Sequence, residues 1–299
     1  MDRRKFLKTA AIGSIGLTLP PLGPLEGLAA PTAPPDLAVA HGASPEQTVK
    51  AAVEALGGMQ RFISRGDIVV VKPNIGWDRV PEQAGNTNPA VVAALVKLCY
   101  DAGAKKVKVF DRPVNDPRRC YVQSGIEAAA RAAGGDVQFV DDRKFREMEI
   151  KGLALKSWPL YAELFEADKV VNVPIAKHHS LAKLTLSMKN WMGIMGGSRR
   201  MIHQKLDESL VDLAMKVKPC LTVLDAVRIL TDNGPQGGDL RDVKKLDTVV
   251  AGTDQVAIDS YGATLFGMKG SDLGYVRLGA QHGFGVMDLD KLRIRKLQV

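Results

Sequence analysis

The sequence is short of cysteine and aromatic residues, and it carries no run of five like charges. Its three cysteines, Cys99, Cys120 and Cys220, lack the spacing of a metal or ferredoxin site, so we expect no iron–sulfur centre. With 5% aromatic residues and dispersed basic residues, a nucleic-acid-binding surface is disfavoured. The formal charge of +8 instead favours a mildly cationic site for an anionic small molecule.

The sequence also has no apolar run as long as the roughly 20 residues that a membrane-spanning helix needs. Its first apolar stretch, residues 9–19, follows Arg3 and Arg4 and precedes Ala29 and Ala30. This order is typical of a secretory signal, and the paired arginines resemble the twin-arginine type. We therefore predict export through the twin-arginine translocase, with a mature protein that is periplasmic or otherwise exported and has no membrane segment.

This interpretation divides the chain into three parts. Residues 1–30 are the expected signal peptide, residues 31–36 a proline-rich linker, and residues 37–299 one folded domain. Because the first 30 residues hold four cations and two anions, their removal lowers the formal charge from +8 to +6. The remaining length is sufficient to bury a full hydrophobic core.

Strand and helix signals alternate along the predicted domain, which favours an α/β fold with a largely parallel sheet flanked by helices. Shorter alternating segments near 146–159 predict a small antiparallel excursion. We expect strands at residues 37–40, 68–71, 106–110, 137–140, 170–175, 221–224 and 248–251. Helices are expected after the caps Ser44, Asn88 and Asp254, up to about residue 133, at 207–216, and from 271 to about 282.

Polar residues stand at or just past the ends of separate predicted strands. They are Lys72, Asn74, Asp111, Lys177, His178 and Asp225. Ligands of open parallel sheets bind in the crevice outside the carboxyl ends of the strands, so these side chains are expected at one edge.

The stretch from Val170 to His203 carries the strongest functional signal. Lys189 and Asn190 are followed by glycines and then by His203, with no carboxylate between Asp168 and Asp207. A solvated face would include carboxylates, so this pattern favours a pocket wall.

These residue types point to specific chemistry. The candidate ligands of a carboxylate or phosphate are Lys72, Asn74, Lys177, Asn190 and Asp111. The catalytic candidates are His178, His203 and Lys189, since imidazole transfers protons near neutral pH. Asp225 and Asp259 are candidate oxygen ligands of a divalent metal.

Five ordered motifs together resemble the domain of unknown function 362 (DUF362) family over essentially the whole predicted mature chain. They are KPN at 72–74, the K-H then T-L-S-M-K-N-x-M-G segment at 177–193, His203, the spacing from Asp225 to the N-G-P ending at Pro235, and D-Q-V-A-I-D at 254–259. The resemblance implies a shared fold and pocket but no reaction. Some members add a ferredoxin-like cysteine module, which is absent from this sequence.

Three functions remain open from the sequence. The first is an enzyme using histidine acid–base chemistry on an anionic small molecule, and the second is a non-catalytic exported binding or assembly protein. The third comes from the order His178, Lys189, His203, which is similar to that of the nickel-pincer lactate racemase family. In that family the lysine tethers the cofactor, one histidine binds nickel and another moves a proton.

Overall fold

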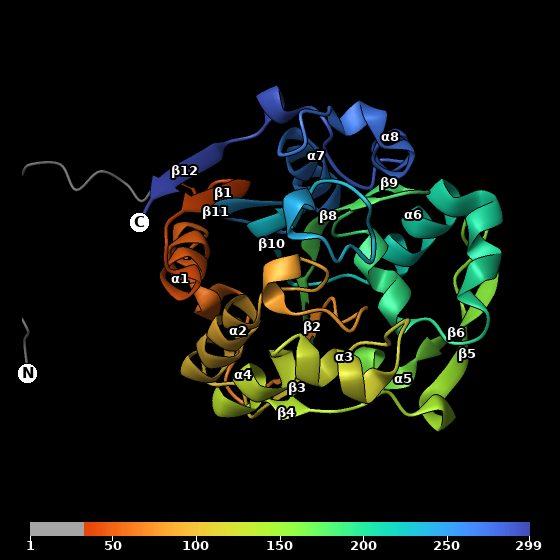
Figure 1. Ribbon diagram of the computed structural model, residues 1–299, viewed down its shortest axis with the longest axis horizontal. Helices are drawn as coiled ribbons and strands as arrows, with labels where there is room; N and C mark the ends of the chain where they lie inside the picture. The colour runs from red at the N-terminus through yellow and green to blue at the C-terminus, as the bar shows by residue number, and fades with distance from the viewer. Residues whose placement is uncertain (1–32) are drawn as a thin grey trace, which may run out of the picture. The chain divides into compact units, whose positions relative to one another are not determined.

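A ten-stranded sheet organises residues 33–299, the part of the chain that the computed structural model describes (Figure 1). Its strands are β1 Leu37–His41, β2 Ile68–Pro73, β3 Lys106–Val109, β4 Asp136–Val137, β7 Lys169–Val173, β8 Ile175–His179, β9 Lys183–Thr185, β10 Leu221–Leu230, β11 Val243–Gly252 and β12 Ile294–Gln298. The predicted signal peptide, residues 1–30, lies outside the described residues. No helix within residues 33–299 is long and apolar enough to cross a membrane.

The main path of the sheet runs β12-β1-β11-β10-β7-β2-β3-β4. Strands β10, β7, β2, β3 and β4 pair in parallel, whereas β11 is antiparallel to both of its neighbours. Strand β8 also pairs in parallel with β10 and carries β9 antiparallel beside it. The predicted α/β fold with a largely parallel sheet is confirmed.

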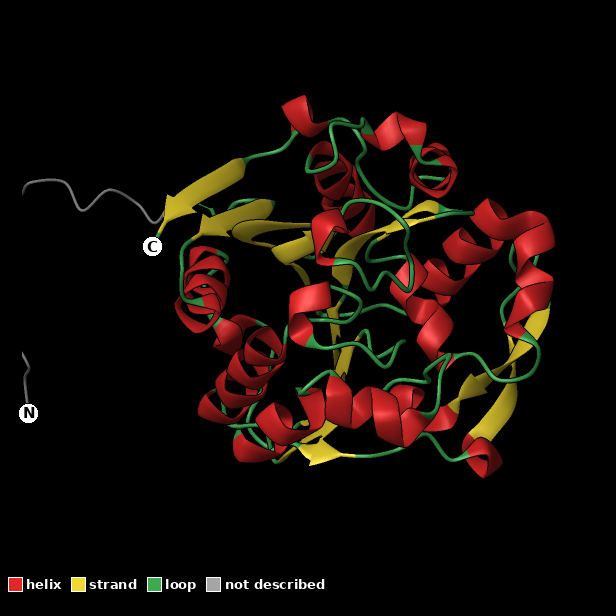
Figure 2. Ribbon diagram, viewed as in Figure 1, coloured by secondary structure: helices red, strands yellow, loops and turns green. Residues whose placement is uncertain are grey.

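Helices cover both faces of the sheet (Figure 2). They are α1 Pro45–Ala55, α2 Pro89–Asp101, α3 Pro117–Gln123, α4 Ile126–Ala132, α5 Ala162–Phe165, α6 Leu206–Lys216, α7 Gln255–Thr264 and α8 Gly274–Gln281. Leu37 and Val39 of β1 pack in the cluster with α6, α7 and α8, while Ala38 and Ala40 pack with α1, α2 and α4. Because successive side chains of a strand point to opposite faces, both sides of the sheet are buried.

Several predicted helices begin where their caps indicate. The side chains of Ser44, Asn88 and Asp254 accept hydrogen bonds from the first turns of α1, α2 and α7. The expected continuous helix up to residue 133 is instead two helices, α3 and α4. They are separated at Gly125, whose φ of 70° is in the left-handed region.

Strand boundaries were less accurate than strand positions. The predicted strand 170–175 is two strands, because Pro174 cannot donate a ladder hydrogen bond and separates β7 from β8. Strands β10 and β11 have ten residues each, far beyond the expected 221–224 and 248–251. Conversely, the expected strand 137–140 pairs only at Asp136–Val137.

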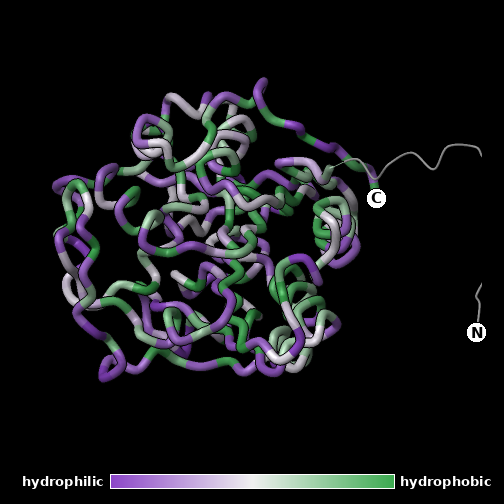
Figure 3. The backbone as a smooth tube through the Cα atoms, turned by 180° about the vertical axis from the view of Figure 1, so that it is seen from behind, coloured by the Kyte–Doolittle hydropathy of each residue, from purple (hydrophilic) through white to green (hydrophobic). Residues whose placement is uncertain are grey.

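The small antiparallel excursion is confirmed as β5 Phe145–Glu149 paired with β6 Ser157–Tyr161. The carboxy-terminal strand β12 was not predicted. It forms an edge beside β1, and Figure 3 shows hydrophilic and hydrophobic residues alternating along it toward the C-terminus. Its exposed Arg295 and Lys296 are typical of an edge strand that must not pair further.

Candidate functional site

A pocket of about 280 Å³ lies where the carboxyl ends of β2, β3 and β7 meet β8 and the segment that follows it. The predicted site residues that line it are Asn74, Asp111, Lys177, Lys189, Asn190 and His203. They come from segments more than a hundred residues apart in sequence. The edge of the parallel sheet brings them together, as the rule for ligand crevices in such sheets anticipates.

A buried ion pair forms the floor beneath this pocket. Lys72, at the end of β2, places Nζ 2.7 Å from Oδ1 of Asp111, and both side chains are nearly inaccessible to solvent. Oδ2 of Asp111 accepts a hydrogen bond from the amide of Ile75. A Cβ added to Gly193 would lie 1.7 Å from Asp111 Oδ1, so this position must be glycine for the segment to pass so close.

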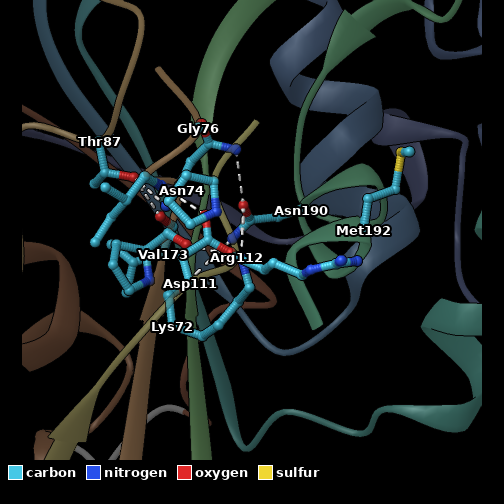
Figure 4. Close-up of polar contacts among 12 residues, drawn as sticks. Lys72, Asn74, Gly76, Thr87, Asp111, Arg112, Val173, Asn190 and Met192 are labelled. Atoms are coloured by element: carbon cyan, nitrogen blue, oxygen red, sulfur yellow. Dashed lines mark hydrogen bonds and ion pairs between the residues drawn. The ribbon is translucent and has the colours of Figure 1, made fainter. Parts of the chain in front are cut away.

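Asn190 connects the ion pair to the rest of the site (Figure 4). Its Oδ1 accepts from Lys72 Nζ and from Asn74 Nδ2, at 3.3 and 3.1 Å. Its Nδ2 donates to the carbonyl oxygen of Lys72 and to Oδ1 of Asn172. All the usual bonding positions of the amide are thus used within the protein, which makes Asn190 a framework residue as much as a ligand residue.

Lys177 on β8 is held by acceptors from a loop. Its Nζ donates to Oδ1 of Asn74 at 3.1 Å and to the carbonyl oxygen of Gly85 at 2.5 Å. Desolvation, with Lys189 nearby, lowers the pKa of Lys177 to about 7. Its position is therefore set by neutral oxygen acceptors, and its charge by burial and the neighbouring lysine.

Lys189 is buried without a carboxylate partner. The residue begins the 3-10 helix η4, Lys189–Ile194, and is 7% exposed. Among residues 33–299, the only hydrogen-bond contact of its Nζ is Sδ of Met192, at 3.2 Å. A thioether is a weak acceptor. Desolvation, together with the nearby Arg199, lowers the pKa of Lys189 to about 7.

The start of η4 is fixed by buried polar contacts. Oδ1 and Oδ2 of Asp259 accept from the amides of Ser187 and Met188, at 2.6 and 3.0 Å. The indole N–H of Trp191 donates to Oε1 of Gln255. Lys189 therefore extends from an anchored segment.

Three arginines also line the pocket, and no sequence motif pointed to them. Arg112 donates to the carbonyl oxygens of Met195 and Gly197, and Arg199 donates to those of Arg112, Met192 and Pro113. Arg200 is exposed at the rim. The lining thus has five cationic side chains and a single carboxylate, Asp111, which is paired with Lys72.

Two imidazoles line the pocket in opposite tautomers. Nδ1 of His179 accepts from the amides of Leu181 and Ala182, so its proton is on Nε2. Nδ1 of His203 lies 3.0 Å from the carbonyl oxygen of Arg200, which can only accept, so Nε2 of neutral His203 is unprotonated. Burial, reinforced by the nearby lysines, lowers the pKa of His179 to about 2 and keeps this ring neutral.

The choice of His178 over His179 requires correction. Strand β8 continues to His179, so Lys177 and His179 share one face and His178 points to the other. His178 accepts from the amide of Gly234 and lines a second pocket of about 620 Å³, which His179 also borders, but it does not line the first. The order His178, Lys189, His203 is therefore not brought together in one site.

The two candidate metal ligands lie apart from the pocket lining. Asp225 accepts from the amides of Asn88 and Val227, and desolvation raises its pKa to about 6. Desolvation likewise raises the pKa of Asp259 to about 7. Within residues 33–299, no group of three or more His, Cys, Asp or Glu side chains is arranged to hold a metal ion.

The free cysteines Cys99 and Cys120 are buried and Cys220 partly so.

Comparisons with known proteins give a family and a general fold. The family model described as domain of unknown function (DUF362) matches residues 69–264. A thylakoid-associated protein of Synechocystis sp. is 29% identical over 220 residues, which cover 71% of this chain and 67% of the relative.

Two solved structures are also similar. One is the lactate racemase apoprotein from Thermoanaerobacterium thermosaccharolyticum, at 13% identity and a TM-score of 0.41, covering 72% of this chain and 53% of that chain. The other is a Thermotoga maritima protein, at 12% identity and a TM-score of 0.40, covering 76% and 60%. The chain thus spans about half to three-fifths of the length of these neighbours, and we draw no functional conclusion from likenesses at this level.

Proposed function

The chain belongs to the DUF362 family, and we propose that this member is an exported protein whose pocket binds a small molecule bearing a carboxylate or phosphate. The observation that carries the proposal is Lys189, a buried amine whose only hydrogen-bond contact among residues 33–299 is a thioether. A buried charge is costly unless it is paired. A bound anion would provide the missing partner, and Arg112 and Arg199 would add to the attraction.

We further propose that the protein acts on this ligand by proton transfer. Nε2 of His203 is free to accept a proton, whereas Nε2 of His179 carries one and can donate a hydrogen bond. A base and a neutral donor beside the same anion suit abstraction of a proton from a carbon or oxygen next to the anionic group. These roles replace the one first assigned to His178.

Binding of small anions is expected to stabilise the protein and to depend on Lys189. Propanoate, succinate and inorganic phosphate, tested at constant ionic strength, should raise the unfolding midpoint by mass action. Lys189→Met should weaken the binding about 10-fold to 100-fold, since a hydrogen bond to a charged group contributes about 1.5–3 kcal/mol. The measurement is the midpoint as a function of anion concentration.

A matched control separates this pocket from general charge effects. Lys50 is on α1 and is exposed, so Lys50→Met removes the same charge at a distance from the pocket. Equal weakening in both variants, or no stabilisation by any anion, would contradict the proposal. Analysis of the ligand recovered after incubation distinguishes the alternatives, because a binding protein returns it unchanged and an enzyme does not.

Export is proposed from Arg3 and Arg4 ahead of the apolar stretch at residues 9–19. Replacing both arginines by lysine is expected to leave most of the precursor in the cytoplasm, because the twin-arginine signal depends on that pair. Cell fractionation with an antibody measures the distribution. An unchanged periplasmic yield would remove the twin-arginine assignment.

The racemase-like isomerase is the weaker alternative. It needs a lysine with two histidines beside it, and His179 with His203 would have to take the places first assigned to His178 and His203. Lys189 would then hold the organic cofactor through its amine. The state of that amine is tested below.

A further inference from the structure

The three buried lysines at this site differ in the atoms that their amines contact. Lys72 contacts a carboxylate, a carbonyl oxygen and an amide oxygen, and Lys177 contacts an amide oxygen and a carbonyl oxygen. In the described part of the chain, the amine of Lys189 contacts only Sδ of Met192. Its amine is thus the one among these three that is not engaged by an oxygen acceptor, although the residue is also buried, at 7% exposed.

The surroundings of Lys189 favour its neutral form. The pocket also contains the basic side chains of Lys177 and Arg199, and no carboxylate within residues 33–299 contacts Nζ of Lys189. Desolvation lowers its pKa to about 7, so close to half of the amine is unprotonated at neutral pH. An unprotonated amine in a cationic pocket is a nucleophile beside a site for negative charge.

We propose that Lys189 forms an imine with a small carbonyl compound that also carries a carboxylate, a 2-oxo acid being the simplest such ligand. This inference rests on the proposed anion pocket and names its ligand class and its nucleophile. The buried amine, the arginines around it and the two imidazoles within the same lining are the features that point to it.

The step balances without a further reactant. The lone pair of Nζ adds to the carbonyl carbon, giving a carbinolamine after proton transfer from nitrogen to oxygen. Loss of the hydroxyl group as water, with the nitrogen losing its second proton, leaves the carbon–nitrogen double bond. Nε2–H of His179 is a donor for the developing oxygen, and Nε2 of His203 accepts a proton. Arg112 and Arg199 provide positive charge for the carboxylate.

Reductive trapping tests the proposal on the full-length exported protein. The protein is incubated with pyruvate and cyanoborohydride, which reduces an imine to a stable secondary amine, and its peptides are mapped by mass. We expect the adduct on the peptide containing Lys189, enriched on the order of 10-fold or more over exposed lysines, whose amines are nearly all protonated at neutral pH. Propanoate lacks the carbonyl and should give none, while acetone lacks the carboxylate and should give far less.

The outcomes separate this inference from the anion pocket itself. If pyruvate raises the unfolding midpoint but labels no lysine, or labels Lys50 as much as Lys189, the imine is excluded and the anion pocket stands. If pyruvate neither stabilises nor labels the protein, the imine is excluded, and the anion pocket fails as well when propanoate, succinate and phosphate also give no stabilisation. A mass already present on Lys189 before treatment also overturns the imine, because the amine is not free, and favours the isomerase alternative.

A variant adds a second line of evidence. Lys189→Arg removes the primary amine, so it should lose labelling. The assignment does not depend on this variant folding, because the peptide map of the unsubstituted protein identifies the labelled residue directly. Labelling that persists in Lys189→Arg would assign the reaction to another lysine and overturn the proposal.

Discussion

Lys72→Met is expected to lower the free energy of unfolding by about 3–5 kcal/mol, because it leaves Asp111 as a buried carboxylate without its cation. Nζ and Oδ1 are 2.7 Å apart, and the two side chains are 0% and 3% exposed. Only the Ile75 amide would remain as a hydrogen-bond donor to Asp111. The substitution also removes the hydrogen bonds from Lys72 Nζ to the Pro73 carbonyl oxygen and to Asn190. The pocket wall should therefore lose order as well as stability.

The denaturant midpoint at constant slope measures this loss. In the double variant Lys72→Met with Asp111→Asn, much of the stability should return, because neither charge is then left buried and alone. Lys97→Met breaks an exposed ion pair with Glu46 and should change stability little. A loss in Lys72→Met no larger than in Lys97→Met would contradict the structural role of the buried pair.

The second large effect is a rise in the stability of the ligand-free protein between pH 7 and about 8.5. The pKa values of Lys177 and Lys189 are lowered from 10.5 to about 7. Above pH 7 the folded protein therefore binds fewer protons at these amines than the unfolded chain does. Each lysine then adds up to about 1.4 kcal/mol of stability per pH unit, and this contribution is lost as pH falls through 7.

Other titrating groups limit the pH range in which the two lysines determine how stability changes with pH. Asp225 and Asp259 have raised pKa values, about 6 and 7, so their contribution decreases as pH rises from 4 toward those values. The thiols of the unfolded chain begin to ionise near the upper end of this pH range and the phenols above it, and burial raises the pKa of Cys99 and Tyr121 in the folded state. Between these ranges the lysines dominate the slope.

Chemical unfolding at pH 7.0, 7.5, 8.0 and 8.5 provides the measurement. Lys189→Met should lower the slope by about the contribution of one lysine, up to about 1.4 kcal/mol per pH unit, whereas Lys50→Met should leave it unchanged. Arg199 and Lys177 face Lys189 and should keep its amine neutral in the absence of a ligand. A saturating anion should flatten the slope by restoring the charge. A flat slope without a ligand would show that the lysines are charged and solvated.

Polar residues after predicted strands were enough to predict which side chains gather at one edge of the sheet. Lys72, Asn74, Asp111 and Lys177 each follow or end a β-branched run, and a parallel sheet gathers such positions at one edge. Local patterns also predicted the caps at Ser44, Asn88 and Asp254, because capping is a contact between residues close in sequence.

Side-chain direction at β8 was decided by pairing between distant strands. The sequence HH at 178–179 contains two equivalent imidazoles, and only the continuation of β8 along β10 and β9 turns His179 into the pocket. The full length of β10 could not be predicted from the sequence either, because it also depends on pairing with a distant strand. Its later residues are held by Lys244 and Lys245 of β11, which lie on a partner strand and carry no strand signal of their own.

By itself the sequence determined the alternation of strands and helices, the family motifs and the gathering of cations without carboxylates between 168 and 207, since these depend on local chemistry and periodicity. Only the tertiary structure decided what each cation contacts. Lys72 forms an ion pair with Asp111, Lys177 donates a hydrogen bond to Asn74, and Lys189 contacts a thioether. Burial and partners differ because they depend on segments far apart in the chain. The sequence shows three lysines but not these different contacts, and the contacts are what make Lys189 the reactive group of the site we propose.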